Sequence, residues 1–405
     1  MRAGTLRIKS FRKKNDDGPV RVSMQLGARE HHLFFESKDI QLAYNMDVFL
    51  TLGFVPAMKH ADTLIVDGEV SPRLLESIYT LSGIYRSWYP SLHDITIEKA
   101  VPAVKTDIRE QRVGLFFSGG VDSFYTLLRH CDEITDLIFV QGFDVDIDND
   151  DLREKTMTMV RDIGSHFGKR VIEVRTNLRL SFLEQYVGWG ILGHGPALTC
   201  VGHLLYPYFK RIYIAASDAY KDTLVFPWGS HPLLDPLWSS ETLEFVHDGC
   251  EADRVQKVAL ISECDKAMKS LRVCYQNRDG AYNCGRCVKC LITMINLYTV
   301  GALDRCTTFD AGLDVREVSR LLILRNKSGD GYVNLKTSLD ELERKKDYGD
   351  VYKALKPVLN RPRWRTKMIR ETRRLGCQLN NIFNRMKSGE NQDKVAGMAD
   401  FSRHD

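Results

Sequence analysis

The sequence lacks several features that would assign it to a class of protein at once. No run of about 18 or more apolar residues occurs in the chain, so a membrane span is not expected. Residues 1–9 contain neither an apolar segment nor a cleavage site, so no export signal is expected. Internal repeats are absent, and a net charge of +4 is too small to indicate nucleic acid by itself. We therefore expect a globular, cytoplasmic chain of 405 residues, long enough for two or three domains.

The Gly-x4-Gly-Lys-Ser/Thr loop is also missing, which makes cleavage between the β- and γ-phosphates of a nucleotide the less expected chemistry. A different glycine turn is present. Val113–Phe117 is a short apolar run that predicts a buried strand, and Val121–Arg129 carries apolar residues at helical spacing. Between them, Gly119 and Gly120 let backbone N–H groups approach a ligand closely. The helix N-terminus adds partial positive charge, so this unit predicts a phosphate site; an ordinary turn without a ligand is the alternative.

The six residues Ser118-Gly-Gly-Val-Asp-Ser123 resemble the PP-loop of the N-type ATP pyrophosphatases. The resemblance implies that the loop holds the pyrophosphate of ATP while a carboxylate or carbonyl oxygen attacks the α-phosphate. It also implies Mg²⁺ as the partner of ATP, with Asp122 orienting the loop or binding the metal. Ser118, Asp122 and Ser123 are then the candidate catalytic residues. The candidate nucleotide-binding residues of the loop are Ser118, Gly119, Gly120, Val121, Asp122 and Ser123.

Residues 109–303 repeat the pattern of strand followed by helix, which predicts a doubly wound parallel sheet in an α/β fold. Ligands of such sheets lie beyond the carboxyl ends of the strands. We therefore expect the loop to share one crevice with three further strand ends, Gly142–Asp144, Arg175–Asn177 and Ala216–Asp218. The resemblance makes Gly142 and Phe143 candidates for contact with adenine, although core packing is an equal alternative for the phenylalanine. Asp218 completes the candidate nucleotide site.

The chain contains ten cysteines, and four of them follow a metal-binding pattern. Cys274, Cys284, Cys287 and Cys290 form the run Cys-x9-Cys-Gly-x-Cys-x2-Cys, whose short spacings direct the sulfurs to one point. Four thiolates close a tetrahedral shell around Zn²⁺ and leave no open position, which indicates a structural site. An iron–sulfur cluster with the same ligands is the alternative. The other cysteines are expected to be scattered buried thiols: Cys131, Cys200, Cys250, Cys264, Cys306 and Cys377.

The glycine loop followed by these four cysteines resembles the 7-cyano-7-deazaguanine synthase family, over residues 112 to 292. The resemblance implies zinc at the cysteines, and adenylation of a carboxylate that ammonia then attacks. The family's Tyr-Pro-Asp-Cys-Arg stretch has no good counterpart here. Residues 216–253 instead form a polar and aromatic segment that we interpret as a substrate wall, with a decorated surface loop as the alternative. Lys221 and Lys257 are candidates for neutralising the negative charge that develops in the transition state.

The flanks lie outside this resemblance. Residues 1–108 predict a mixed α/β extension with an antiparallel meander, and with a helix that begins at Ser71-Pro72. Residues 304–387 predict helices, including one over 314–324 that Asp314 begins with a capping-box pattern and one over 339–355. The basic segment 361–374 suits either a solvated face, an acidic partner or the phosphates of nucleic acid. Residues 388–405 are expected to be a disordered tail.

These patterns lead to one main hypothesis. The chain is expected to be a ligase of the HUP, or adenine nucleotide alpha hydrolase-like, fold that forms a C–N bond while ATP is cleaved to AMP and pyrophosphate. Its substrate would be a small carboxylic acid, such as a deazapurine acid, or a partner protein in a bacterial antiviral system. The alternatives are a tRNA-modifying enzyme of thiolase or lysidine type, and an ATP-binding subunit without turnover. A homodimer is compatible with the sequence, which does not identify the acid or the nucleophile.

Overall fold

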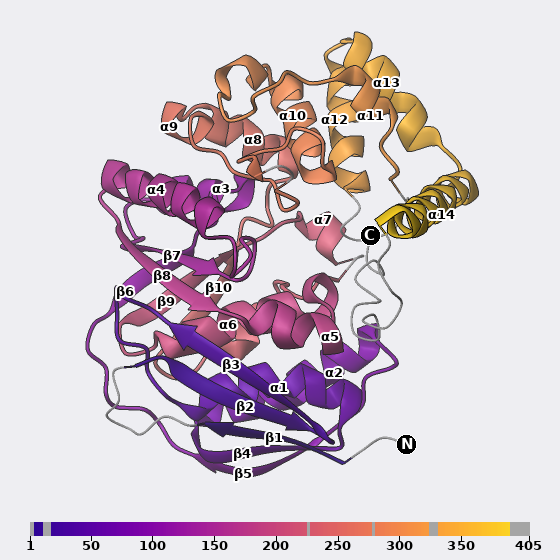
Figure 1. The fold of residues 1–405 in the computed structure, drawn as a ribbon. Coiled ribbons are helices and arrows are strands. Elements are labelled where there is room, and N and C mark those ends of the chain that lie inside the picture. Colours follow the sequence, from indigo (N-terminus) through magenta and orange to yellow (C-terminus); the bar gives the residue numbers. More distant parts are fainter. Residues whose placement is uncertain (1–3, 11–17, 225–226, 278–279, 324–330, 389–405) are drawn as a thin grey trace.

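The computed structural model describes residues 4–10, 18–224, 227–277, 280–323 and 331–388, and within them ten strands form one continuous sheet (Figure 1). The strand order is β10-β9-β6-β7-β8-β3-β2-β1-β4-β5, and most of the neighbouring pairs are parallel. The predicted α/β class with a largely parallel sheet is therefore confirmed. The strands are β1 (Thr5–Ser10), β2 (Val20–Leu26), β3 (Arg29–Glu36), β4 (Thr63–Val70), β5 (Thr96–Pro102), β6 (Arg112–Phe116), β7 (Asp136–Gln141), β8 (Arg170–Thr176), β9 (Phe209–Ala215) and β10 (Glu244–Asp248).

The first part of the chain extends this sheet. Strands β1, β2 and β3 form the predicted antiparallel meander, whereas the α1–β4 unit between residues 46 and 70 was not predicted. Strand β3 pairs antiparallel with β8 through Phe35 and Thr176 and through Glu36 and Arg175. The sheet therefore runs without interruption across the predicted domain boundary at residue 108.

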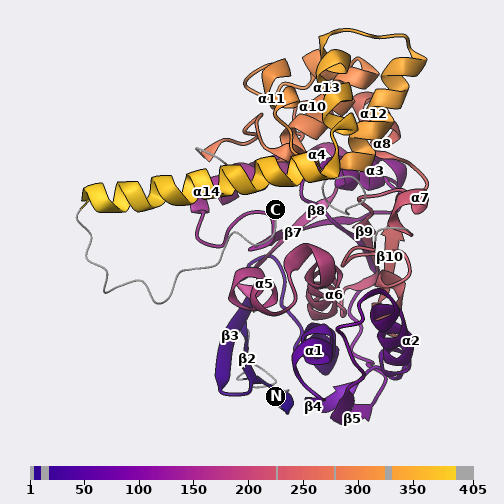
Figure 2. The same ribbon diagram turned by 90° about the vertical axis from the view of Figure 1, so that its right-hand side faces the viewer.

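Helices lie on both faces of the sheet, as a doubly wound fold requires (Figures 1 and 2). Helices α1 and α6 pack together on one face, and α3 and α8 pack together on the other. The main helices are α1 (Met46–His60), α2 (Pro72–Trp88), α3 (Val121–Arg129), α4 (Asp150–Phe167), α5 (Glu184–Tyr186), α6 (His194–Leu204), α7 (Tyr220–Thr223), α8 (Arg254–Ser262), α9 (Asp265–Met268), α10 (Val288–Val300), α11 (Val315–Ser319), α12 (Tyr332–Arg344), α13 (Asp350–Asn360) and α14 (Arg363–Ser388). Short helical turns, η1 (Arg179–Leu183), η2 (Trp189–Gly193), η3 (Asp235–Trp238) and η5 (Leu303–Arg305), lie between them.

The C-terminal region is helical, but two of its predicted helices have different bounds. The helix predicted over 339–355 is two helices, α12 and α13, because the chain turns at Lys346, which has a left-handed φ of 59°. Asp314 caps α11 as predicted, but the helix ends at Ser319. Glu317 pairs with Arg320 instead of completing a capping box. The predicted turn at 326–331 falls mostly, and the tail at 388–405 almost entirely, outside the described residues.

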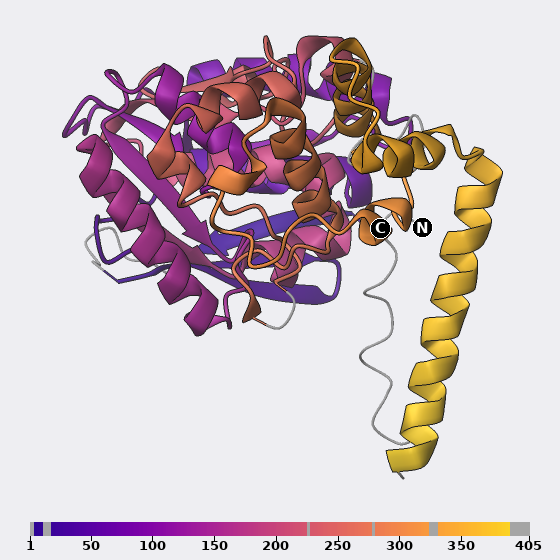
Figure 3. The same ribbon diagram turned by 90° about the horizontal axis from the view of Figure 1, so that it is seen from above.

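Three groups of buried apolar side chains hold these layers together. The largest joins the N-terminal strands and α1 to residues of β7, β8 and α6, so it spans both sides of residue 108. The second lies under α3, α4 and α8 and includes three of the four clustered cysteines. The third packs α10 against α11, α12 and α13. Helix α14 leaves this body and projects from it (Figures 2 and 3).

Candidate functional site

A cavity of about 400 Å³ opens at the carboxyl ends of β6, β7 and β9. It brings together most of the residues predicted from the sequence. The strand ends at 143–144 and 217–218 meet the glycine turn there, together with segments from α8, α10 and the start of α12. The predicted site residues that line the cavity are Ser118, Gly120, Val121, Asp122, Ser123, Phe143 and Asp218.

The glycine turn connects the buried strand β6 to the nine-residue helix α3. Gly119 has a φ of +78°, a conformation that other residues rarely adopt, and an added Cβ would lie 2.5 Å from the Met159 side chain. Its carbonyl accepts a hydrogen bond from the backbone N–H of Arg272 at 2.8 Å. The hydroxyl of Ser123 donates to the Gly120 carbonyl at 3.1 Å. The turn is thus held from both sides while its N-terminal face opens onto the cavity.

Asp122 lies between two cations contributed by α8. Its carboxylate is 3.1 Å from Nη1 of Arg254 and 3.5 Å from Nζ of Lys257. Lys257 is fully buried and also donates to the Ala216 carbonyl at 2.6 Å, so it connects the α3 N-terminus to the end of β9. Asp218 lies close by, where burial is the main cause that raises the pKa of its carboxyl group, with a further contribution from Asp122. Of the two predicted lysines, Lys257 therefore contacts the site through Asp122, although it does not line the cavity itself.

Other predicted positions lie elsewhere. Gly142 does not line the cavity; its φ is +100° and an added Cβ would lie 1.8 Å from the Thr176 carbonyl oxygen, so packing explains this glycine. Gly119 does not line the cavity either; it contributes to the shape of the turn through its positive φ. The strand end at 175–177 was expected in the crevice, but Asn177 bonds the backbone of β3 at Phe34 and His32. Lys221 is exposed and lies 3.6 Å from Asp253.

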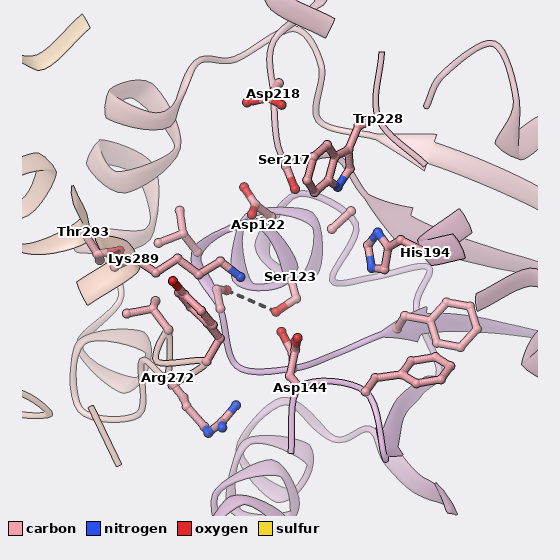
Figure 4. A pocket seen from close by; sticks show the side chains of 18 of the residues that line it. Asp122, Ser123, Asp144, His194, Ser217, Asp218, Trp228, Arg272, Lys289 and Thr293 are labelled. Atoms are coloured by element: carbon pink, nitrogen blue, oxygen red, sulfur yellow. Dashed lines mark hydrogen bonds between the residues drawn. The ribbon is translucent and has the colours of Figure 1, made fainter. Parts of the chain in front are cut away.

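The sequence analysis missed the cations that surround the cavity. Arg179, Arg254, Arg272 and Lys289 all line it, and each comes from a different part of the chain. Burial acts to raise the pKa of the Asp144 carboxyl group, but the charges of Lys289 and Arg272 outweigh it and hold that pKa below its usual value. Asp144 and Lys289 both point to the space in front of Ser123 (Figure 4).

Several polar atoms around the cavity are buried without a hydrogen-bond partner within the described ranges. Buried polar groups are nearly always paired in proteins, and a polar ligand in the cavity could pair these atoms. Four of these atoms are nitrogens, namely Nε of Arg179, Nε of Arg254, Nε of Arg272 and Nδ1 of His194. Oδ1 of Asp122 also has no hydrogen bond, but it lies 3.5 Å from Nζ of Lys257.

One side of the cavity is aromatic. The rings of Phe143 and Trp189 lie 4.7 Å apart, and the Arg179 guanidinium lies 4.8 Å from the centre of the Trp189 ring. Trp228 and His194 continue this wall (Figure 4). Burial lowers the pKa of His194 to about 4, so this imidazole is neutral at pH 7 and adds no charge toward a phosphate. Of the predicted substrate wall, residues 216–253, the cavity is lined by Ser217, Asp218, Asp222 and Trp228.

The four predicted cysteines come together beside the cavity. The ligand atoms of Cys274, Cys284, Cys287 and Cys290 all lie within 4.8 Å of one another, and the sulfurs of Cys274 and Cys287 are 3.9 Å apart. A tetrahedral shell with Zn–S bonds of about 2.3 Å places sulfurs about 3.8 Å apart, so the set fits zinc. Hydrogen bonds with Cys287 and Cys290 hold the pKa of Cys274 well below its usual value. The predicted cluster of four cysteines, able to hold a metal ion, is therefore present in the structure.

The cysteine cluster is connected to the cavity by short stretches of chain. Cys287 caps α10, whose residues Val288 and Lys289 line the cavity, and Cys274 lines the cavity itself together with Arg272 and Val273. The backbone N–H of Arg272 also donates to the Gly119 carbonyl. A metal at the cysteines would therefore fix the position of the cavity wall relative to the glycine turn.

Comparison with family models, characterised proteins and solved structures finds no match to this chain. Across the described residues, no helix has both the length and the apolar character needed to cross a membrane.

Proposed function

We propose that this chain is a PP-loop ATP pyrophosphatase of the HUP type that adenylates a carboxylate and then transfers the acyl group to ammonia or an amine. The observation that carries the proposal is the turn at Ser118–Ser123, which opens onto a cavity where arginine and lysine side chains gather and three arginine Nε atoms have no partner among the described residues. A triphosphate is the natural guest of a helix N-terminus surrounded by fixed positive charge.

The proposed roles follow from position. Backbone N–H groups of the turn would hold the outer two phosphates, and Asp122, which lines the cavity beside Arg254, would orient the turn or bind Mg²⁺. Lys289 and Arg254 would offset the charge that develops as the bond between the α-phosphorus and the pyrophosphate oxygen breaks. The aromatic wall of Phe143, Trp189 and Trp228 would receive the flat parts of ATP or of the acid.

The second step needs a base or a hydrogen-bond acceptor for the incoming amine. Asp144, whose pKa the neighbouring cations hold below its usual value, lies across the cavity from Ser123, where its carboxylate can accept a hydrogen bond from the attacking nitrogen and orient it. The acyl carbon then gains the C–N bond and AMP leaves with the electrons of the broken C–O bond. A deazapurine carboxylic acid is the first substrate to test, because the chain resembles 7-cyano-7-deazaguanine synthase.

The four clustered cysteines favour this reaction over sulfur transfer to tRNA. Persulfide chemistry needs one or two reactive thiols, whereas here all four thiols lie together in one cluster. Cys274 lines the cavity, but it belongs to this cluster with the other three. We therefore assign them to a structural metal.

Nucleotide products separate the candidate functions. With α-labelled ATP and a panel of carboxylic acids with ammonia, we expect AMP and pyrophosphate in equal amounts and only with the right acid. Arg254→Met should remove most of this turnover, whereas Lys221→Met, which lies outside the cavity lining, should not. Stimulation by tRNA alone would favour the tRNA-modifying enzyme, and ADP as product would contradict the proposal. ATP binding without turnover would favour the binding subunit.

A further inference from the structure

Two segments that are distant in sequence pack tightly together on the aromatic side of the cavity. They are the turn η2 and the loop before η3, and two backbone hydrogen bonds join them. The Gly229 N–H donates to the Gly190 carbonyl at 2.9 Å, and the Gly195 N–H donates to the Gly229 carbonyl at 3.1 Å. A Cβ added to Gly190 would lie 2.1 Å from the Trp228 ring. Because glycine lets this ring lie directly against the backbone, the packing restricts the orientation of Trp228.

The same packing places His194, the first residue of α6, beside the two tryptophans. The rings of Trp189 and His194 meet edge to face with their centres 5.2 Å apart. Trp189, His194 and Trp228 all line the cavity, and we call the part that they line the aromatic slot. Figure 4 shows Trp228 and His194 on the side of the cavity opposite Lys289. Aromatic walls of this kind bind flat rings by stacking.

His194 is the polar group of this slot, and it is uncharged. Its Nδ1 atom is buried and has no hydrogen-bond partner in the part of the chain that the structure describes. Burial is the main cause that lowers the pKa of His194 to about 4, and the charges of Asp144 and Asp235 do not reverse it. A neutral imidazole offers one N–H donor and one acceptor. Its natural partner is therefore an uncharged donor or acceptor, whereas phosphates and carboxylates are better served by Lys289 and Arg254.

We propose that His194 determines specificity by forming a hydrogen bond through Nδ1 to the edge of a planar, nitrogen-containing ring that stacks in the aromatic slot. Ring nitrogens and exocyclic amino or carbonyl groups lie in the plane of such a ring and supply the uncharged partner. A site that makes this hydrogen bond discriminates strongly against a ligand that lacks it, because the imidazole is then left unpaired.

This inference deepens the proposed function and rests on it for the identity of the ring. Two molecules of the proposed reaction carry a ring of this chemistry, ATP through adenine and the acid if it is a deazapurine. The experiment distinguishes these two sources.

The test measures binding to the full-length protein by tryptophan fluorescence and calorimetry. The ligands are ATP, a deazapurine carboxylic acid, and inorganic tripolyphosphate, which carries negative charge but no ring. His194→Phe keeps a flat side chain without nitrogen atoms. We expect this variant to bind at least one ring ligand about tenfold more weakly and tripolyphosphate unchanged. Weaker binding of ATP identifies the ring as adenine, and weaker binding of the acid identifies it as the ring of the acid.

Three further variants control for structural effects. His194→Asn carries an amide near the position of Nδ1, so it should recover part of the affinity lost in His194→Phe. Trp228→Leu should reduce the fluorescence change that the same ring ligand causes. His166→Phe, at an exposed histidine on α4, should bind all three ligands as the original chain does.

Three results would overturn the proposal. His194→Phe could bind both ring ligands as tightly as the original chain, it could lose affinity for tripolyphosphate equally, or neither ring ligand could bind to the original chain. The proposed function fails separately. Binding that depends on His194 without formation of AMP would contradict that function and keep this inference, whereas AMP formation with unchanged affinities in His194→Phe would do the reverse.

Discussion

Asp122 lies within ion-pair distance of two cations, Arg254 and Lys257. Lys257 is fully buried and also donates to a backbone carbonyl, so the lysine depends on this carboxylate to offset its charge. Asp122→Asn should therefore lower the free energy of unfolding by about 2 kcal/mol and remove pyrophosphate release. Denaturant titration and a product assay would measure the two effects separately.

A second substitution distinguishes the two roles of Asp122. Asp122→Asn combined with Lys257→Met removes both charges, so it should recover part of the lost stability but no turnover. Recovery of turnover in the double variant would show that the carboxylate only compensates the lysine. Of the two residues, only Arg254 would then keep a role in the proposed reaction, which is to offset the developing charge.

A glycine at position 142 can be explained either by contact with a ligand or by packing within the protein. The sequence suggested contact with adenine, whereas the structure places the Thr176 carbonyl where a side chain would be. Gly142→Ala should cost about 3 kcal/mol or more in stability, because both the close contact and the positive φ are unfavourable. Gly168→Ala, at a positive φ with open space around it, should cost only about 1 kcal/mol. Similar losses at both positions, measured by chemical denaturation, would contradict this explanation.

The buried pair of His247 and Asp235 should make stability depend on pH. Burial alone would lower the pKa of His247, but the 2.7 Å hydrogen bond to Asp235 and the charge of that carboxylate raise it to about 9. The folded protein thus holds a proton that the unfolded chain releases near pH 6.5. This stabilisation is complete below about pH 6.5 and is lost as the pH rises through about 9.

Unfolding midpoints measured between pH 6 and pH 10 would test this dependence. The stability of the original chain should fall by about 3 kcal/mol across the interval, apart from contributions of other groups. In Asp235→Asn the fall should be much smaller, since the imidazole then has no carboxylate to hold its proton. An equal fall in both proteins would contradict the assignment.

At the scale of elements, the cysteine cluster and the glycine turn form one unit. Cys287 caps α10, and the backbone N–H of Arg272, just before Cys274, donates a hydrogen bond to the Gly119 carbonyl of the turn. The two patterns lie far apart in sequence, yet they share a wall of the cavity. Loss of the metal should therefore affect nucleotide binding as well as stability.

Cys287→Ser should reduce bound zinc to well below one equivalent, lower the melting temperature by several degrees and weaken ATP binding. The physical reason is that the remaining three thiolates no longer close the tetrahedral shell that holds Lys289 and Arg272 in place. Cys131→Ser lies outside the cluster and should retain zinc. Metal analysis, calorimetry and a nucleotide-binding titration measure the three quantities. Full zinc content in Cys287→Ser would rule out the site as assigned.

At the scale of the whole molecule, the sheet and the largest core group both cross residue 108. The β3–β8 pairing buries Phe35 and Thr176 at the junction, so neither side can open without exposing apolar surface. We predict that β1–β5 and β6–β10 unfold in one transition. Hydrogen exchange should then give similar opening free energies for the amides of β2 and β9. Two separate transitions, or a stable fragment starting at residue 109, would show that the N-terminal extension is an independent domain.

Short-range patterns in the chain were sufficient to predict the α/β class, the turn at Ser118–Ser123, the helix that begins at Pro72 and the cysteine cluster. Each of these depends on a few neighbouring residues, whose backbone conformations and spacing constrain one another directly. The same patterns could not reveal Arg179, Arg254, Arg272 and Lys289 as a group. An isolated arginine or lysine in a sequence has no local signal, because only the packing of η1, α8, the loop after α9 and α10 decides that they share a cavity.

Tertiary contacts also decided why certain residues are present. Position 142 must be glycine because the Thr176 carbonyl, distant in sequence, occupies the space of a side chain. Strand β3 likewise pairs with β8 as well as with its sequence neighbour β2. The attachment of α14 depends on the carbonyl groups of Leu321 and Leu322, which Arg361 and Arg370 contact, and no local pattern in the sequence identifies those partners. Partners that lie far apart along the chain are chosen by the folded arrangement, and the local sequence does not encode that choice.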